Sequence, residues 1–146
     1  MRPPLDGELV ITSPYGWRIH PVLGTRKYHN GVDLRAPQGT PVHAVMSGYV
    51  HALDLVGTGA GGCWVRLVHG AAIGTTRLLW STYCHLSRVD VARGDYVQEG
   101  HVIGLSGGTV GTHGAGRSTG PHLHWSMWEG PGDRTDIDPL PWLGAG

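Results

Sequence analysis

The chain has 146 residues, which is within the usual range for one domain and enough to enclose a hydrophobic core. Its formal net charge is zero with neutral histidines, so the composition gives no indication of a nucleic acid or an anionic surface as partner. No apolar run reaches the roughly 18 residues of a membrane span, and residues 1–6 lack the apolar core of a signal peptide. We expect no membrane insertion, and a chain that is cytoplasmic, exported by another route, or a domain cut from a larger protein.

The glycine and proline content predicts a chain of short strands. There are 25 glycines and 10 prolines, and no hydrophobic pattern of helical period extends over any length. Residues 8–12 are predicted to form an edge strand, and residues 13–18 a turn that leads into an extended segment. We therefore expect a mainly β fold.

Residues 29–33 read His-Asn-Gly-Val-Asp, which places a histidine and an aspartate four residues apart. One helical turn would bring them together, but Gly31 and the β-branched Val32 disfavour a helix. A loop that runs into a strand is predicted, with His29 on the loop and Asp33 in the strand. Taken alone the spacing is a weak signal, because a His–Asp pair is often a structural hydrogen bond.

Residues 42–50 are predicted to form a strand that is interrupted at 47–48, and a hairpin is predicted to follow from residues 63–69 and 78–85. If these two strands pair around the intervening turn, partner numbers sum to about 147. That register assigns one face to the core and the other to a more polar surface, and a slip by one residue would mix the two sets. The predicted core face holds Cys63, Val65, Leu67, Leu78, Trp80, Thr82 and Cys84, and the predicted polar face holds Trp64, Arg66, Val68, Ser81, Tyr83 and His85.

The same register makes Cys63 and Cys84 neighbours across the hairpin. A disulfide and two small buried thiols are equally compatible with that position. The predicted register also directs the Cys84 side chain toward the core. A hydrolase that uses Cys84 as nucleophile next to His85 is therefore disfavoured.

Further short strands are predicted within residues 93–100 and 102–105, followed by a long glycine-rich loop at 107–120. The C-terminal residues 136–143 are expected to pack Trp142 and Leu143 against the domain.

The stretch Pro121-His122-Leu123-His124-Trp125 follows the glycine-rich loop and is predicted to be extended. Side chains two residues apart in a strand share a face, so His122 and His124 would project side by side, roughly 7 Å apart. Leu123 and Trp125 would face the core. An isolated pair of this kind can arise by chance in a chain with 10 histidines.

Several of these side chains could together hold a metal ion. Catalytic zinc usually has three protein ligands and an open position for water, and a neutral histidine nearby can take a proton from that water. The candidate residues are His29, Asp33, His122 and His124, with His85 on the polar face of its strand. The residue types leave open which histidine of the 122/124 pair is a ligand. The other six histidines (His20, His43, His51, His69, His101 and His113) are expected to be structural or exposed.

Three motifs together resemble the M23 family of metallopeptidases, the lysostaphin- and LytM-like peptidoglycan endopeptidases. The motifs are His29-Asn30-Gly31-Val32-Asp33, Tyr83-Cys84-His85-Leu86-Ser87 and Gly120-Pro121-His122-Leu123-His124, in the family's order and approximate spacing. The resemblance covers roughly residues 13–140, and residues 1–146 are predicted to form a single domain.

The resemblance implies an antiparallel β-sheet groove with one zinc ion at its floor. It implies that His29, Asp33 and His124 are the zinc ligands, and that His122 and His85 act on the attacking water and the transition state. The implied substrate is a bacterial peptidoglycan peptide, and the implied place of action is the cell wall. A monomer is expected, and the lack of a visible signal peptide favours a phage-encoded enzyme or an excised domain.

Two questions stay open at this level. The chain could be an active endopeptidase or a non-catalytic relative that regulates wall enzymes, although such relatives usually lose metal ligands. A D-Ala-D-Ala carboxypeptidase is a third reading, but those enzymes have a wider His-to-Asp spacing. The bond could be glycyl-glycine or D-Ala-to-diaminopimelate, and Arg18, Arg26 and Arg117 near the motifs favour the latter because they could bind a carboxylate.

Overall fold

The computed structural model describes residues 1–19, 22–71, 77–131 and 134–143, and it confirms a mainly β, antiparallel fold. Regular helical structure in these residues is confined to a short 3-10 turn, Leu140–Trp142. Within the described ranges no helix is long and apolar enough to cross a membrane.

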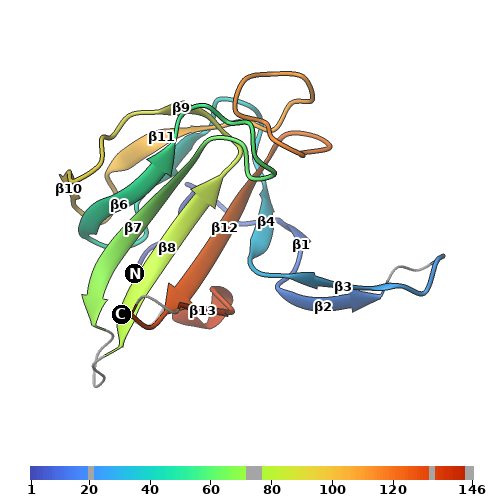
Figure 1. Cartoon of the computed structure of the whole chain (residues 1–146), viewed down its shortest axis with the longest axis horizontal. Helices are drawn as coiled ribbons and strands as arrows, with labels where there is room; N and C mark the ends of the chain where they lie inside the picture. The colour runs from blue at the N-terminus through green and yellow to red at the C-terminus, as the bar shows by residue number, and fades with distance from the viewer. Residues whose placement is uncertain (20–21, 72–76, 132–133, 144–146) are drawn as a thin grey trace.

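One large antiparallel sheet, of eight strands in the described residues, organises the molecule (Figure 1). Its strands in spatial order are β1 (Ile11–Ser13), β4 (Val32–Arg35), β12 (His122–Glu129), β8 (Leu78–Cys84), β7 (Trp64–Ala71), β6 (Gly48–Asp54) and β10 (Tyr96–Val97), with β13 (Thr135–Ile137) also on β12.

Two smaller sheets complete the fold. The strands β5 (Pro41–His43), β11 (Val102–Ser106) and β9 (Leu86–Val89) form a three-stranded sheet, and β2 (Gly16–Ile19) and β3 (Arg26–His29) form a hairpin that projects away from the body (Figure 1). The segment predicted as one interrupted strand is therefore divided between two sheets, with β5 in the small one and β6 in the large one.

The hydrophobic core lies between the inner face of the large sheet and the three-stranded sheet. Leu123 and Trp125 of β12 are fully buried in it, as the alternation of this strand predicted. Val42 and Ile103 contribute from the small sheet. Leu143 packs against this core from the C-terminal segment, whereas Trp142 is partly exposed and is not among the residues that pack there.

The predicted register of the β7–β8 hairpin is wrong by one residue. Val65 pairs with Tyr83 and Arg66 with Thr82, so that partner numbers sum to 148. The inner face of β8 therefore carries Ser81 and Tyr83, which the sequence had assigned to the polar face. Tyr83 is fully buried and its hydroxyl accepts a hydrogen bond from the Val45 backbone N–H at 3.1 Å.

Internal hydrogen bonds explain why this assignment failed. Ser81 Oγ lies 2.8 Å from Tyr83 Oη and 2.7 Å from His69 Nε2, so the polar groups on the core face have partners. Since buried hydroxyls with partners are tolerated in a core, side-chain polarity alone could not fix the register.

The corrected register also separates the two cysteines. Cys63 belongs to the hydrophobic core, whereas Cys84 pairs with His124 on the outer face, and both are free thiols. The disulfide interpretation and the core-facing position of Cys84 are thus both wrong. Burial nevertheless raises the pKa of the Cys84 thiol to about 12, so it stays protonated and is a poor nucleophile.

Candidate metal centre

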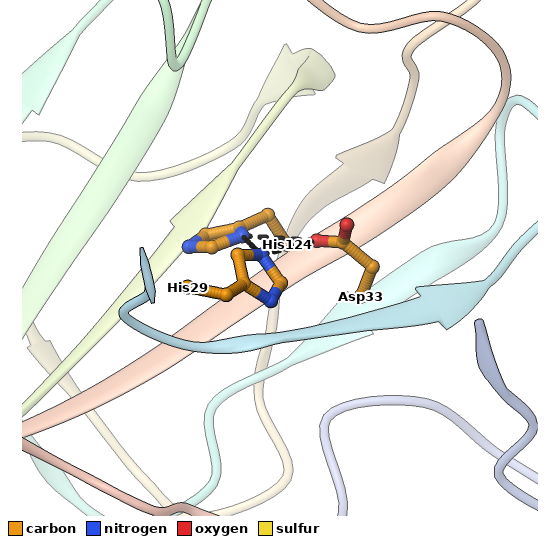
Figure 2. A group of neighbouring side chains, drawn as sticks. All are labelled: His29, Asp33 and His124. Atoms are coloured by element: carbon orange, nitrogen blue, oxygen red, sulfur yellow. Dashed lines mark hydrogen bonds and ion pairs between the residues drawn. The ribbon is translucent and has the colours of Figure 1, made fainter. Parts of the chain in front are cut away.

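Three side chains, two from adjacent strands of the large sheet and one from the β2–β3 hairpin, converge on the outer face of the large sheet. His29 ends β3, Asp33 lies in β4, and His124 lies in β12 directly opposite Asp33 (Figure 2). Asp33 Oδ1 is 2.9 Å from His124 Nδ1 and 3.3 Å from His29 Nε2, and the two histidine nitrogens are 3.2 Å apart. Their ligand atoms all lie within 4.8 Å of one another, and His29 occupies the end of a strand where a loop had been predicted.

The turn between His29 and Asp33 has no room for a side chain at Gly31. A Cβ atom there would stand 2.5 Å from the Trp125 carbonyl oxygen and 3.0 Å from His124 Nε2. The glycine therefore lets the turn approach β12 closely enough for the two histidines to meet.

Acceptor groups fix the tautomers of both histidines. His29 Nδ1 donates to the Pro14 carbonyl at 2.9 Å, and His124 Nε2 donates to Asn30 Oδ1 at 3.1 Å. In a neutral ring the other nitrogen then carries a lone pair, and in both residues that nitrogen faces Asp33. Two imidazole lone pairs and a carboxylate pointing at one place are the donor set that zinc takes in catalytic sites, with the outer partners expected of such ligands.

The ionisation of Asp33 also fits a cation. Burial acts to raise the pKa of Asp33, but hydrogen bonds and positive charge from His124 and His29, present when the nitrogens that face Asp33 carry protons, outweigh it and hold the pKa well below its ordinary value. A bound cation would replace those protons. The carboxylate is therefore ionised at neutral pH and can serve as a ligand.

His122 and His85 lie beside these three residues. His122 Nδ1 is 2.8 Å from the Gly120 carbonyl oxygen, and its Nε2 is 3.7 Å from Asp33 Oδ1. His85 Nδ1 is 2.7 Å from the Ala115 carbonyl oxygen, and its ring centre is 4.7 Å from that of His122. Each ring has Nδ1 held as a donor, which leaves Nε2 as the basic nitrogen.

The backbone at His85 is in an unusual conformation. With φ of 62°, it is the one described residue other than glycine with a positive φ. Neighbouring backbone groups hold it there, because His85 N donates to the Gly61 carbonyl at 2.8 Å and Leu86 N to the Cys63 carbonyl at 3.0 Å. Strain of this kind, maintained by the surrounding structure, is frequent at functional sites.

The loop at residues 107–120, orange in Figure 1, supplies part of the site. It provides the carbonyl groups of Ala115 and Gly120 that bind His85 and His122. These carbonyl groups and that of Pro14 belong to the backbone, so the pattern of side chains in the sequence could not predict that they would bind the site histidines. Asn30 was within a motif, but its hydrogen bond to His124 could not be foreseen from its identity.

Two of the three arginines predicted to bind substrate have partners within the chain. Arg18 donates to Ser13 Oγ, and Arg26 lies over the ring of Trp17 at 4.9 Å. Arg117 is exposed. His20 lies outside the described residues.

The family model of peptidase family M23 matches residues 27–139. The chain therefore belongs to peptidase family M23, which confirms the resemblance drawn from the three motifs.

Individual relatives agree with this assignment. The DD-carboxypeptidase/endopeptidase Mpg of Neisseria meningitidis serogroup B is 40% identical over 115 residues, which are 79% of this chain and 23% of that protein. A zinc-containing peptidase from Vibrio cholerae superposes with a TM-score of 0.72 at 31% identity, over 92% of this chain and 38% of that one. The catalytic domain of lysostaphin from Staphylococcus simulans gives a TM-score of 0.70 at 34% identity, over 92% of each chain. The chain spans about a quarter of the length of the curated relatives it matches.

Proposed function

We propose that this chain is a zinc-dependent endopeptidase that cleaves peptide bonds in the stem peptides or cross-links of bacterial peptidoglycan, with D-Ala-to-diaminopimelate as the favoured bond. The convergence of His29, Asp33 and His124, with both histidine lone pairs turned toward the carboxylate, is the observation that carries this proposal. It also weighs against a non-catalytic relative, since the complete donor set is in place. Such an enzyme would act at the cell wall.

In the proposed mechanism His29, Asp33 and His124 would hold one zinc ion. When bound, zinc would supply a Lewis acid for the scissile carbonyl and lower the pKa of a coordinated water. His85 and His122 would accept a proton through Nε2. The Nε2–H of the protonated ring would donate a hydrogen bond to the oxygen that becomes charged and would then return the proton to the leaving amine.

The environment of His85 suits this task. Burial lowers the pKa of His85, and this effect outweighs the hydrogen bond to the Ala115 carbonyl, which acts to raise it. The ring is therefore neutral at pH 7 and able to take a proton.

Removal of metal tests the proposal. A chelator should abolish digestion of purified diaminopimelate-type walls, and added zinc should restore it, because the three donors would no longer have a cation to hold. Zinc per chain is measured by elemental analysis and new termini by mass spectrometry, with circular dichroism as the control for folding. Full digestion in excess chelator would contradict zinc dependence, and release of glycine peptides from pentaglycine-bridged walls alone would assign glycyl-glycine specificity instead.

A further inference from the structure

The outer face of the large sheet, which holds His124, also carries an arginine without an ion-pair partner in the described chain. Arg66 of β7 pairs with Thr82 of β8, and Thr82 pairs with Ser126 of β12, two residues beyond His124. Because paired residues share a face of the sheet, Arg66 and His124 project to the same side.

Two contacts within the sheet hold the guanidinium group of Arg66 in place. Its Nε donates to Thr82 Oγ1 at 3.2 Å, and its central carbon lies 5.0 Å from the ring centre of Trp64. Val65 pairs with Tyr83, and the next residue of β8, Cys84, pairs with His124. Trp64, the residue before Val65, therefore lies at the same end of the sheet as His124. Two strand spacings separate β7 from β12, so the two strands lie about 10 Å apart across the sheet.

The far edge of this guanidinium has no partner in the described residues. Its Nε is the only atom that donates a hydrogen bond to a described group, which leaves the four N–H groups of Nη1 and Nη2. Those four groups form the planar fork that matches a carboxylate through two parallel hydrogen bonds.

Positive charge accumulates on this face. Arg134 lies 4.6 Å from the ring centre of Trp80, also an outer-face residue. Burial is the largest cause of the lowered pKa of His51, and the positive charges of Arg134, Arg66 and Arg93 lower it further.

The carboxylates of the same face are engaged elsewhere. Asp33 belongs to the metal centre, Asp54 accepts from the backbone N–H groups of Val56 and Gly57, and Asp136 accepts from Tyr28. Within the described ranges no carboxylate lies at ion-pair distance from Arg66 or Arg134.

We propose that Arg66 binds the free carboxylate of diaminopimelate in the stem peptide, and so selects acidic over amidated substrates. This inference rests on the proposed peptidoglycan substrate. An extended peptide advances about 3.5 Å per residue, so a stem held at His124 reaches Arg66 within about three residues. Thr82 and Trp64 pre-orient the guanidinium for this contact, which limits the entropy lost on binding.

Peptide binding tests the subsite without requiring turnover. The probes are L-Ala-γ-D-Glu-diaminopimelate-D-Ala and the same peptide with its diaminopimelate carboxylate amidated, titrated into the zinc-loaded chain by calorimetry. Amidation and Arg66→Met should each weaken binding about 10–100-fold, the range of a charged hydrogen-bonded contact. Combining them should cost little more, because both remove the same contact.

Controls localise the effect. Arg66→Lys keeps the charge but loses the fork, and should fall between wild type and Arg66→Met. Arg88 is an exposed residue of β9 that forms an ion pair with Asp90. Arg88→Met should leave the affinities for the acidic and the amidated peptide unchanged. The indole resonance of Trp64 should shift with the acidic peptide only.

The outcomes separate the subsite from the proposed function. Coupling between amidation and Arg66→Met supports the subsite even if the chain cleaves no wall. Equal affinities for the two peptides, additive losses, or no binding of either peptide would overturn it even if the chain digests walls.

Discussion

At the scale of single residues, the two histidines of the His122-Leu123-His124 stretch differ through their partners rather than their position. Both project from one face of β12. His124 Nδ1 is 2.9 Å from Asp33 Oδ1, whereas His122 Nε2 is 3.7 Å from that oxygen. This difference in distance and tautomer is consistent with a ligand in one case and a proton-transfer group in the other.

Substitution of each histidine should therefore have a different consequence. His124→Ala removes one of three proposed ligands, so zinc content and activity should fall together. His122→Ala leaves the three ligands in place, so zinc should be retained while the rate falls about 10²–10⁴-fold through the loss of a proton-transfer group. Zinc per chain and the rate of wall digestion are the two measurements.

His85→Ala should behave as His122→Ala does, and the double variant should lose less than the product of the two single effects if both act on one water. Loss of zinc in His122→Ala with retention in His124→Ala would reverse the assignment. Activity retained in any of these variants would remove that residue from the mechanism.

At the scale of elements, the register of β7 and β8 decides which side chains share a face. The observed register brings Cys84 next to His124 on the outer face and leaves Cys63 in the core. Two thiols on opposite faces of a sheet cannot form a disulfide without movement of the backbone.

Thiol labelling checks this register. The intact mass of the unreduced protein should correspond to two free thiols, and reduction should leave it unchanged. Native labelling should be slow, because burial raises the pKa of both the Cys63 and Cys84 thiols and little thiolate forms. Unfolding in denaturant without reductant should make both react at once. A gain of two mass units on reduction would contradict the structure.

The elements also show what the sequence could and could not predict. Alternation in β12 predicted the faces of Leu123 and Trp125, since one side of that strand is uniformly apolar. The hairpin register was wrong because Ser81 and Tyr83 are polar and yet buried. The Ser81 hydroxyl contacts His69 of β7, and the Tyr83 hydroxyl accepts a hydrogen bond from the Val45 backbone N–H. Long-range contacts of this kind, like the carbonyls that orient the site histidines, are absent from any local pattern.

At the scale of the whole molecule, the described strands build one core between two sheets and leave the candidate metal centre on the outer face. The three motifs lie far apart in the sequence and meet because β4, β12 and β8 are neighbours in the large sheet. A single domain over residues 1–146 and a monomeric state stay predictions, as do the individual roles of the site residues.

A series of hydrogen bonds that runs from the partly buried His69 to the buried Ser81 and Tyr83 affects the pH dependence of stability. His69 Nδ1 donates to the Ser47 carbonyl at 3.0 Å, and His69 Nε2 accepts a hydrogen bond from the Ser81 hydroxyl. The Ser81 hydroxyl is in turn hydrogen-bonded to that of Tyr83. Burial lowers the pKa of His69, against a smaller opposing effect of the Ser47 hydrogen bond. The folded chain thus binds this proton only at lower pH than the unfolded chain does.

The sign follows from proton linkage. Below the unfolded pKa of about 6.5, the unfolded chain binds a proton at His69 that the folded chain does not, so the free energy of unfolding falls as pH falls, by up to about 1.4 kcal/mol per pH unit. His69→Gln keeps a donor and an acceptor without titrating, so its urea unfolding should lose less stability between pH 8 and pH 5 than the wild type. Both proteins are compared in chelator, which removes the contribution of metal. Since His85 and His51 also have lowered pKa values but are present in both proteins, their contributions cancel in the difference. Parallel stability profiles for the two proteins would show that His69 is not a source of the acid sensitivity.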